Sequence, residues 1–326
     1  SSTGVPVPCH SAIKGARCTA LERLGQGLAL LPVPAESLLD VDRPLDLARA
    51  AAPLQAQQPR PGLRGLAASL SLDPTRPGLW SIVGSGGKTS LLYTLAAELA
   101  ARGHCLAVTT TTHIHPPAAG QADGPWLWGQ ESPGLEQVAA RLLPGRPLCL
   151  AAGRRADGKL QGLSPGQMAT LLEVPGLWVL CEADGAAGRP LKGWAAHEPA
   201  LTGLEAGVIV VAGASGLGRP LEARWVHRPQ EFARASGLAP GQAVTPLALA
   251  LALGGAHGPL RGQPDPPAAP PASLLINQAE SLSPAAWRQL CAALSEHGRW
   301  RALLGASLRL GRYAACPPGT QALGGK

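Results

Sequence analysis

The chain has 326 residues, which is enough for one large domain or two smaller ones. Hydrophobic residues make up 45% of it and charged residues 15%, a balance that argues against disorder along its whole length. The net charge of +7 suits a phosphate-bearing ligand, whereas the scattered arginines and the lack of interleaved aromatic residues do not support a nucleic-acid groove.

Seven cysteines are spaced widely, and none belongs to a Cys-x-x-Cys pair. Cys105, Cys149 and Cys181 stand inside apolar runs, as small core residues do. This usage favours a reducing compartment. The sequence shows neither a signal peptide nor an apolar run long enough to span a bilayer. We therefore expect a cytoplasmic protein that binds neither membranes nor nucleic acid.

Residues 1–60 differ in character from the rest of the chain. They contain a short apolar run at 28–33 and the segment LLDVDRPLDL at 38–47. A stretch rich in Ala, Gln and Pro follows at 50–62 and is typical of a linker. We therefore divide the chain into an N-terminal extension over 1–60 and a main domain over 61–326.

The main domain opens with a short predicted helix and then a strand–helix–strand pattern. The spacing predicts a helix over 63–72, a strand over 78–83, a helix over 89–101 that stops at Gly103, and a strand over 105–109. A glycine-rich loop joins the first strand to its helix. This order is that of a βαβ unit, whose two strands are parallel.

Strands and helices continue to alternate down to the C-terminus. Further strands are predicted over 148–151, 177–181, 208–212, 274–276 and 301–306, and further helices over 135–143, 246–253 and from Ser283 to Gly298. Ser283 followed by Pro284 is a favourable helix start. The buried face of that helix is predicted to carry Trp287, Leu290, Cys291 and Leu294. The pattern predicts an α/β fold with a mostly parallel central sheet flanked by helices.

The glycine-rich loop has the residue types that phosphate binding requires. Glycines let backbone N–H groups turn inward, and the following helix adds the positive end of its dipole. Lys88 can reach the β- and γ-phosphates of a nucleoside triphosphate, and the Thr89 hydroxyl can bind Mg²⁺. We therefore expect a P-loop-type fold that binds ATP or GTP with Mg²⁺. The expected contacts are Gly84, Ser85, Gly86, Gly87, Lys88, Thr89 and Ser90.

Two other interpretations of this loop stay open. The full phosphate-loop pattern has glycine where Ile82 stands, so the bland alternative is a tight strand-to-helix turn without a ligand. A dinucleotide site needs G-x-G-x-x-G, which Gly84 and Gly86 begin but no third glycine completes. Such a site also has an acid at the end of the second strand, where this chain has threonines.

Four threonines at 109–112 follow the second strand, in the region where ligands bind in such folds. Their hydroxyls could bind phosphate oxygens or a metal-bound water, and we assign Thr110 and Thr111 to the nucleotide site. The alternative is a strand end selected for β-propensity. His113 and His115 share the spacing of one strand face, but a lone pair is weak support for a metal site.

An apolar strand ends in two carboxylates, Glu182 and Asp184, which face the same way in an extended chain. Carboxylates this close repel each other unless a cation lies between them. We therefore expect them to hold Mg²⁺ together with Thr89, or one of them to orient an attacking water. Arg189 and Lys192 could clamp an anionic group or stabilise transition-state charge. The alternatives are an acidic surface turn and solvated surface charge.

Seven segments, in this order, resemble the selenium-dependent hydroxylase accessory proteins of the YqeC type. They are VGSGGKT (83–89), TTTTHI (109–114), EADGAAGRPLK (182–192), HEP (197–199), VHRPQEF (226–232), VTPLAL (244–249) and LLINQAE (274–280). The third segment is the most specific of them. The resemblance implies a nucleotide-binding maturation factor for molybdenum hydroxylases. It also implies a molybdenum hydroxylase apo-enzyme or a cofactor-biosynthesis protein as partner.

Two shorter resemblances accompany this one. Residues 277–280 (NQAE) resemble the Asn-Lys-x-Asp element that reads guanine, so Asn277 could contact the base; the alternative is a strand followed by a turn. The segments at 13–17 (IKGAR) and 38–47 are similar to the C-terminal tail of molybdopterin nucleotidyltransferases, with Arg43 in place of a usual Thr. The extension is then either a remnant of such a domain or unrelated to it.

These residues together predict ATP or GTP hydrolysis, or phosphoryl transfer. Lys88 and Arg189 would stabilise charge, and Glu182 or Asp184 would hold Mg²⁺. The alternative is a nucleotide-switched protein that delivers a cofactor to an apo-enzyme without significant turnover of its own. A third possibility is a structural α/β domain that takes no ligand.

Overall fold

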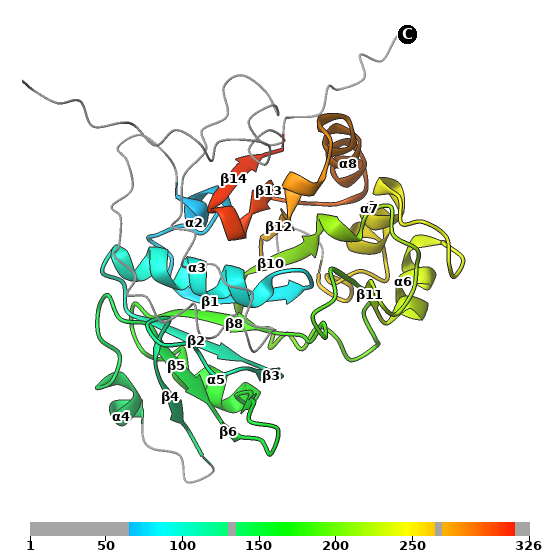
Figure 1. Ribbon diagram of the computed structural model, residues 1–326. Helices are drawn as coiled ribbons and strands as arrows, with labels where there is room; N and C mark the ends of the chain where they lie inside the picture. Colours follow the sequence, from blue (N-terminus) through cyan, green and yellow to red (C-terminus); the bar gives the residue numbers. More distant parts are fainter. Residues whose placement is uncertain (1–64, 130–134, 265–268, 317–326) are drawn as a thin grey trace, which may run out of the picture.

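The computed structural model describes residues 65–129, 135–264 and 269–316 (Figure 1). The predicted extension over 1–60, with its resemblance to nucleotidyltransferases, lies outside the described residues. No helix within the described ranges has the length together with the apolar composition that crossing a membrane would need.

A nine-stranded sheet forms the centre of the molecule, in the order β14-β13-β12-β10-β1-β8-β2-β5-β4. Its strands are β1 (Gly78–Gly84), β2 (Leu106–Thr110), β4 (Asp123–Leu127), β5 (Leu148–Ala151), β8 (Trp178–Glu182), β10 (Glu205–Gly213), β12 (Ala272–Asn277), β13 (Ala302–Ser307) and β14 (Arg312–Ala315). Every neighbouring pair is parallel except β13 with β14. The predicted α/β fold with a mostly parallel sheet is confirmed.

Helices cover both faces of this sheet (Figure 1). Helices α2 (Leu66–Ser69) and α3 (Lys88–Ala101) pack against the face that carries Trp80 and Ile82. The opposite face, which carries Leu79 and Val83, is covered by the remaining helices. These are α4 (Leu135–Ala139), α5 (Pro165–Leu171), α6 (Pro229–Ser236), α7 (Pro246–Gly254) and α8 (Pro284–His297). Neighbouring residues of β1 point to opposite faces, so one strand supplies both cores.

The order of the central strands places the candidate site. Strands β1 and β2 are parallel, as predicted, but they are not neighbours, because β8 lies between them and pairs with both. The carboxyl ends of all three strands therefore meet at one edge of the sheet. Because Ile82 of β1 is in register with Glu182 of β8, the end of β8 lies beside the glycine-rich loop.

The longest C-terminal helix follows its sequence signals closely. Ser283 caps α8 by accepting a hydrogen bond from the Ala286 N–H, and Gly298 ends the helix. Its buried residues are Trp287, Leu290, Cys291 and Leu294, as predicted. The strand β14 was missed because the chain doubles back after β13, and only its partner strand makes it a strand. Helices α5 and α6 were missed as well, because each is only about two turns long.

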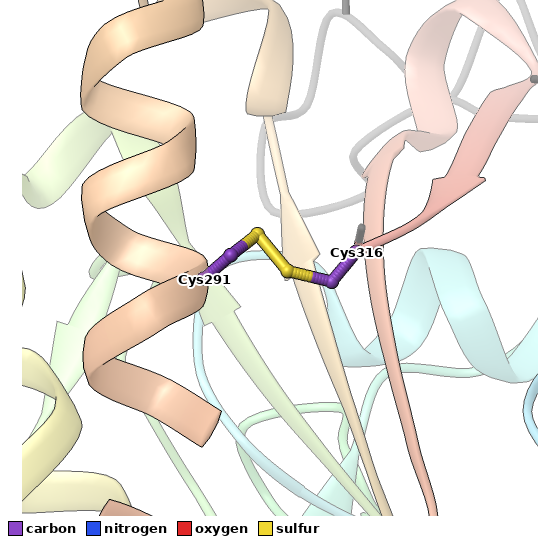
Figure 2. Close-up of a disulfide and its surroundings, with 2 residues drawn as sticks. All are labelled: Cys291 and Cys316. Atoms are coloured by element: carbon purple, nitrogen blue, oxygen red, sulfur yellow. A yellow bond between two sulfur atoms is a disulfide. The ribbon is translucent and has the colours of Figure 1, made fainter. Parts of the chain in front are cut away.

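Two cysteines that the sequence did not pair form a disulfide. Cys291 of α8 is joined to Cys316, which follows β14 (Figure 2). Of the three predicted core cysteines, Cys149 and Cys181 are buried, whereas Cys105 is only partly buried. Burial raises the pKa of Cys149 to about 12, so its thiol stays protonated and inert.

Small two- and three-stranded sheets hold the loops beyond the main sheet. Strands β9 (Leu191–Lys192) and β11 (Val226–His227) pair in parallel. Strands β3 (His113–Ile114), β6 (Gly153–Arg154) and β7 (Leu160–Gln161) form a second unit. Because β9 pairs with β11, the segment that follows Asp184 is fixed against the segment that precedes α6.

Candidate functional site

The glycine-rich loop runs from the end of β1 to the start of α3. Gly84, Gly86 and Gly87 have φ angles of +105°, +75° and +133°. Residues other than glycine rarely adopt such positive φ angles. A Cβ on Gly84 would lie 2.1 Å from the carbonyl oxygen of Val211, and one on Gly87 would lie 2.3 Å from Nδ2 of Asn277. The loop therefore has this shape only because it has no side chains at these positions.

This shape leaves a row of backbone N–H groups open. The first helical hydrogen bond of α3 runs from the Leu91 N–H to the Gly87 carbonyl, at 2.9 Å. Gly87 has no side chain that could cap the helix. Within the part of the chain that the structure describes, the N–H groups of residues 86–90 have no hydrogen-bond partner. Together with the positive end of the helix dipole, they form a site suited to an anion.

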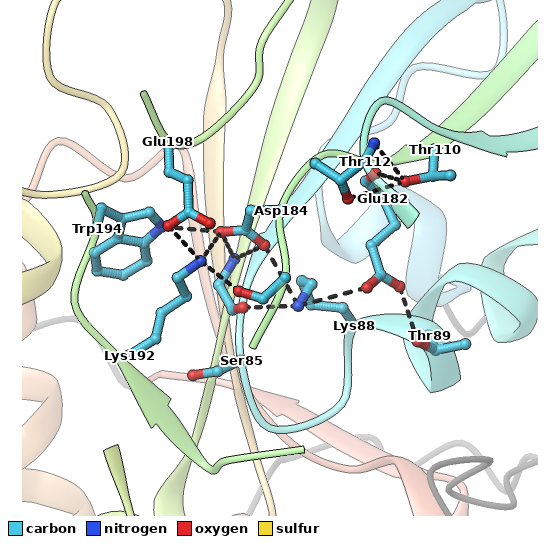
Figure 3. Close-up of polar contacts among 12 residues, drawn as sticks. Ser85, Lys88, Thr89, Thr110, Thr112, Glu182, Asp184, Lys192, Trp194 and Glu198 are labelled. Atoms are coloured by element: carbon cyan, nitrogen blue, oxygen red, sulfur yellow. Dashed lines mark hydrogen bonds and ion pairs between the residues drawn. The ribbon is translucent and has the colours of Figure 1, made fainter. Parts of the chain in front are cut away.

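Lys88 lies at the centre of the site, between two carboxylates (Figure 3). Its Nζ donates to the Gly84 carbonyl at 2.8 Å and lies 3.5 Å from Oε1 of Glu182 and 3.4 Å from Oδ1 of Asp184. Burial lowers the pKa of Lys88 and is the largest single influence, but the two carboxylates outweigh it and raise that pKa. Lys88 is therefore a cation, and it is the charge that keeps Glu182 and Asp184 together.

Glu182 reaches the first turn of α3 from the end of β8. Its Oε2 accepts a hydrogen bond from the Thr89 hydroxyl at 2.8 Å (Figure 3). The structure thus brings together two of the three oxygen-bearing side chains that the sequence assigned to Mg²⁺. Both are hard oxygen ligands, and they lie at the open end of α3, so this pair fits a magnesium ion that also contacts a phosphate.

Asp184 is fully buried and has a different set of partners. Both of its oxygens accept from the Gly84 N–H at 3.0 Å, and Oδ2 also accepts from Nζ of Lys192 at 3.0 Å and Nε1 of Trp194 at 2.9 Å. These bonds tie the start of the loop to the segment after β8. Asp184 is thus enclosed by donors of this chain, whereas Glu182 contacts the Thr89 hydroxyl at the start of α3. The metal role expected from the sequence therefore fits Glu182 better than Asp184.

Lys88, Glu182 and Asp184 form a charged cluster, and Lys192 extends this cluster away from the loop. Its side chain is fully buried, and Nζ lies 3.1 Å from Oε2 of Glu198, which also pairs with Arg228. The sequence suggested that Lys192 clamps an anionic ligand; the structure instead pairs it with two carboxylates of this chain. Trp194 and Glu198 were not predicted at all. Glu198 belongs to the HEP segment, whereas Trp194 lies between two of the quoted segments, and nothing local shows that either side chain is buried.

The threonine run fixes the neighbouring strands. The hydroxyls of Thr109, Thr110 and Thr111 donate to backbone carbonyls of Leu150, Glu182 and Ala200 at 2.9, 2.6 and 2.9 Å. These bonds give the threonines a structural use, and their assignment to a nucleotide stays a prediction. Exposed His113 lies 2.9 Å from Arg155, and no group of three or more His, Cys, Asp or Glu among the described residues could hold a metal.

Asn277 and Arg189 also have partners within the chain. Asn277 Nδ2 donates to the Gly86 carbonyl at 2.7 Å, and its Oδ1 accepts from the Leu308 N–H at 3.1 Å. Asn277 therefore supports the glycine-rich loop from β12, and contact with a base stays a prediction. Arg189 donates to the carbonyls of Ala223 and Ala187 at 2.8 and 3.1 Å. These contacts direct its guanidinium to the loop before β11.

A cavity of about 1300 Å³ lies elsewhere in the molecule. It is lined by Pro77, Ala272, Gly254 and Gly298, at the starts of β1 and β12 and at the ends of α7 and α8. The cavity is therefore at the edge of the sheet opposite the glycine-rich loop, and no residue of the charged cluster lines it. We place the candidate site by its chemistry, at the carboxyl ends of the strands.

Comparison with known proteins finds relatives for the same part of the chain. Residues 80–230 match the model of the YqeC protein family, and this range includes the loop and every member of the charged cluster. The chain is 37% identical over 166 residues to the uncharacterized protein YqeC of Escherichia coli (strain K12). That match covers 51% of this chain and 63% of the relative, and no solved structure matches. Over residues 80–230, which are slightly less than half of the chain, the sequence is therefore similar to the YqeC protein family.

Proposed function

We propose that this protein binds the phosphates of ATP or GTP, with Mg²⁺, at the loop over residues 84–90. The observation that carries the proposal is the row of N–H groups at residues 86–90, at the start of α3, for which the described part of the chain supplies no acceptor. A tight turn without a ligand would leave these donors unused. A dinucleotide site is a weaker fit, because Thr110 at the end of β2 donates to a backbone carbonyl and no acid stands there.

The side chains around the loop divide the work. Lys88 would leave its carboxylates and contact the β- and γ-phosphates as a point charge. The Thr89 hydroxyl and the Glu182 carboxylate would hold Mg²⁺, which would neutralise charge on the phosphate oxygens. Asp184 would keep Gly84 in place, and Asn277 would hold the Gly86 carbonyl away from the phosphates.

We propose hydrolysis or transfer of the terminal phosphoryl group as the reaction. One observation favours the alternative, a nucleotide-switched protein with little turnover of its own. The Arg189 guanidinium, expected to stabilise the transition state, is bound to the Ala223 and Ala187 carbonyls. Turnover that rises steeply on adding a partner protein would support the switch. Fast turnover with a small acceptor would support the enzyme.

The cellular role that we propose rests on the resemblance in sequence motifs. The protein would act in the cytoplasm as a maturation factor for selenium-dependent molybdenum hydroxylases. Its partner would be the apo-enzyme or a protein that makes the cofactor. The relative from Escherichia coli is named only as uncharacterized, so it adds similarity in sequence and no activity.

Calorimetric titration with ATP and with GTP, each with Mg²⁺, tests the binding site directly. We expect micromolar affinity for one of them in the wild-type protein and a loss of at least about a hundredfold in Lys88→Ala, because a buried charge–phosphate contact is removed. Lys159→Ala is the matched control, since Lys159 lies on the β6–β7 turn outside the cluster. A folded wild-type protein that binds neither nucleotide at millimolar concentration would refute the proposal.

A further inference from the structure

The charged cluster contains a second buried lysine whose role the phosphate site does not explain. Lys192 is fully buried, and its three N–H donors are all used. They contact Asp184 at 3.0 Å, the Gly185 carbonyl at 2.6 Å and Glu198 at 3.1 Å. Burying an ammonium group removes its hydration, and this cost must be offset by charged and hydrogen-bonding partners. The partners of Lys192 therefore indicate its role.

The two lysines hold the same carboxylate in different ways. Lys192 lies 3.0 Å from Asp184, whereas Lys88 lies 3.4 Å from it and 3.5 Å from Glu182 (Figure 3). Lys192 belongs to β9, which β11 holds in register, while Lys88 begins α3 beside the open N–H groups. Lys192 is therefore the fixed cation of the pair, and Lys88 is the one that can move.

The charges of the cluster balance only when both lysines are counted. Its cations are Lys88, Lys192 and Arg228, and its carboxylates are Glu182, Asp184 and Glu198. If Lys88 turns towards a phosphate, Asp184 loses one of its two cations. Without Lys192 it would then be a fully buried carboxylate with only neutral donors, Gly84 and Trp194. Such a carboxylate would hold Lys88 back.

We propose that Lys192 is a positioning residue of the phosphate site: it is the permanent counter-ion of Asp184, and it thereby releases Lys88 to bind phosphate. The proposal rests on the proposed phosphate site. Its surroundings keep Lys192 in place for this role. Trp194 packs near its ammonium, 5.8 Å from Nζ to the ring centre, and Arg261 binds the carbonyls of Trp194, Ala195 and Glu198.

The test is a double-mutant cycle of Lys192→Met and Asp184→Asn, read by calorimetric titration with ATP and GTP in Mg²⁺. We expect Lys192→Met to bind nucleotide about tenfold more weakly than the wild type, or worse. In the Asp184→Asn background, the same substitution should change the affinity by less than about threefold, because a neutral Asn does not compete for Lys88. Lys159→Met serves as the control and should bind as the wild type does.

A structural role alone for Lys192 would weaken binding equally in both backgrounds, and that result would overturn the proposal. Wild-type affinity in a folded Lys192→Met variant would overturn it too. If the Lys192→Met variant does not fold, Glu198→Gln provides the test. This substitution removes one carboxylate partner of Lys192, keeps its ion pair with Asp184, and makes the cluster one charge more positive. We expect it to bind nucleotide at least as tightly as the wild type, and a tenfold loss would contradict the proposal. If the wild-type protein itself binds neither ATP nor GTP, the result refutes the phosphate site, and it is thereby distinguished from a failure of the role proposed for Lys192 alone.

Discussion

At the scale of single residues, two carboxylates that look equivalent in the sequence have separate roles in the structure. Glu182 accepts from the Thr89 hydroxyl at the open end of α3, whereas Asp184 is enclosed by the Gly84 N–H, Lys192 and Trp194. The first position allows an ion to be shared with a phosphate. The second position anchors the loop and encloses the carboxylate among donors of this chain.

This difference predicts that substitutions of the two carboxylates change the Mg²⁺ dependence of nucleotide affinity differently. Glu182→Gln should bind nucleotide about tenfold more weakly in the presence of Mg²⁺, because one charged ligand to the ion is lost. The variant should show little further loss when Mg²⁺ is chelated. Asp184→Asn should keep the magnesium dependence of the wild type, whatever its absolute affinity. Calorimetry with and without a chelator measures both, and the reverse pattern would assign the metal to Asp184.

At the scale of elements, the glycine-rich loop is fixed by its neighbours in the sheet. The carbonyl of Val211 on β10 accepts from the Ser85 N–H at 2.9 Å, and the carbonyl of Pro190 accepts from Ser85 Oγ at 2.9 Å. Asn277 on β12 donates to the Gly86 carbonyl of the loop at 2.7 Å. The segments that hold the loop thus come from parts of the chain that are far apart in sequence, so the sheet must be complete before the loop has its shape.

Gly84→Ala tests how tightly the sheet surrounds the loop. Its Cβ would lie 2.1 Å from the Val211 carbonyl, a buried strand atom that cannot move aside, at a φ of +105°. We expect the free energy of unfolding to fall by about 3 kcal/mol or more and nucleotide binding to be lost. Urea denaturation measures the first effect and calorimetry the second.

Gly103→Ala is the matched control for that substitution. Gly103 also has a positive φ, +80°, but a Cβ there has no atom within 4 Å. We therefore expect a cost of only about 1 kcal/mol, from backbone strain alone, and unchanged nucleotide affinity. Equal losses in the two variants would mean that strain, and not contact with β10, governs the loop.

At the scale of the whole molecule, the buried cluster links the glycine-rich loop to the segment before α6. The link runs from Asp184 through Lys192 and Glu198 to Arg228, the residue that precedes α6. His227, on β11, lies next to this chain of charges. Burial lowers the pKa of His227 below its ordinary value of 6.5, and the nearby cations Lys192 and Arg228 lower it further.

This shift makes stability depend on pH in a defined direction. The unfolded chain takes up a proton on this histidine as the pH falls through 6.5, whereas the folded protein takes it up only at lower pH. The free energy of unfolding should therefore be undiminished by this group above pH 6.5 and should fall as the pH drops below it. His227→Gln should flatten this part of the profile, whereas exposed His115→Gln should leave it unchanged. Urea denaturation between pH 5 and 8 measures the profiles, and a slope that survives in His227→Gln would contradict the assignment.

The sequence alone determined the features that depend on neighbouring residues. The loop between β1 and α3, the cap and buried face of α8, and the buried strand β10 follow from glycine positions, capping residues and periodicity. The pairing of Thr89 with Glu182 was also within reach. Parallel strands end at one edge, so a residue after β1 and a residue ending β8 were expected to lie together.

Only the tertiary structure decided which groups hold one another inside the cluster. Asp184 is 100 residues from Gly84 in sequence, and it reaches that N–H because β8 inserts between β1 and β2. The sequence left Lys192 as a clamp for an anionic group or as solvated surface charge. The pairing of β9 with β11 instead buries it between two carboxylates. Periodicity and motif spacing report local conformation. Burial and charge pairing depend on the order of strands that are distant in sequence. For this chain, that order separates Glu182, which we propose as the metal ligand, from Asp184, which anchors the loop.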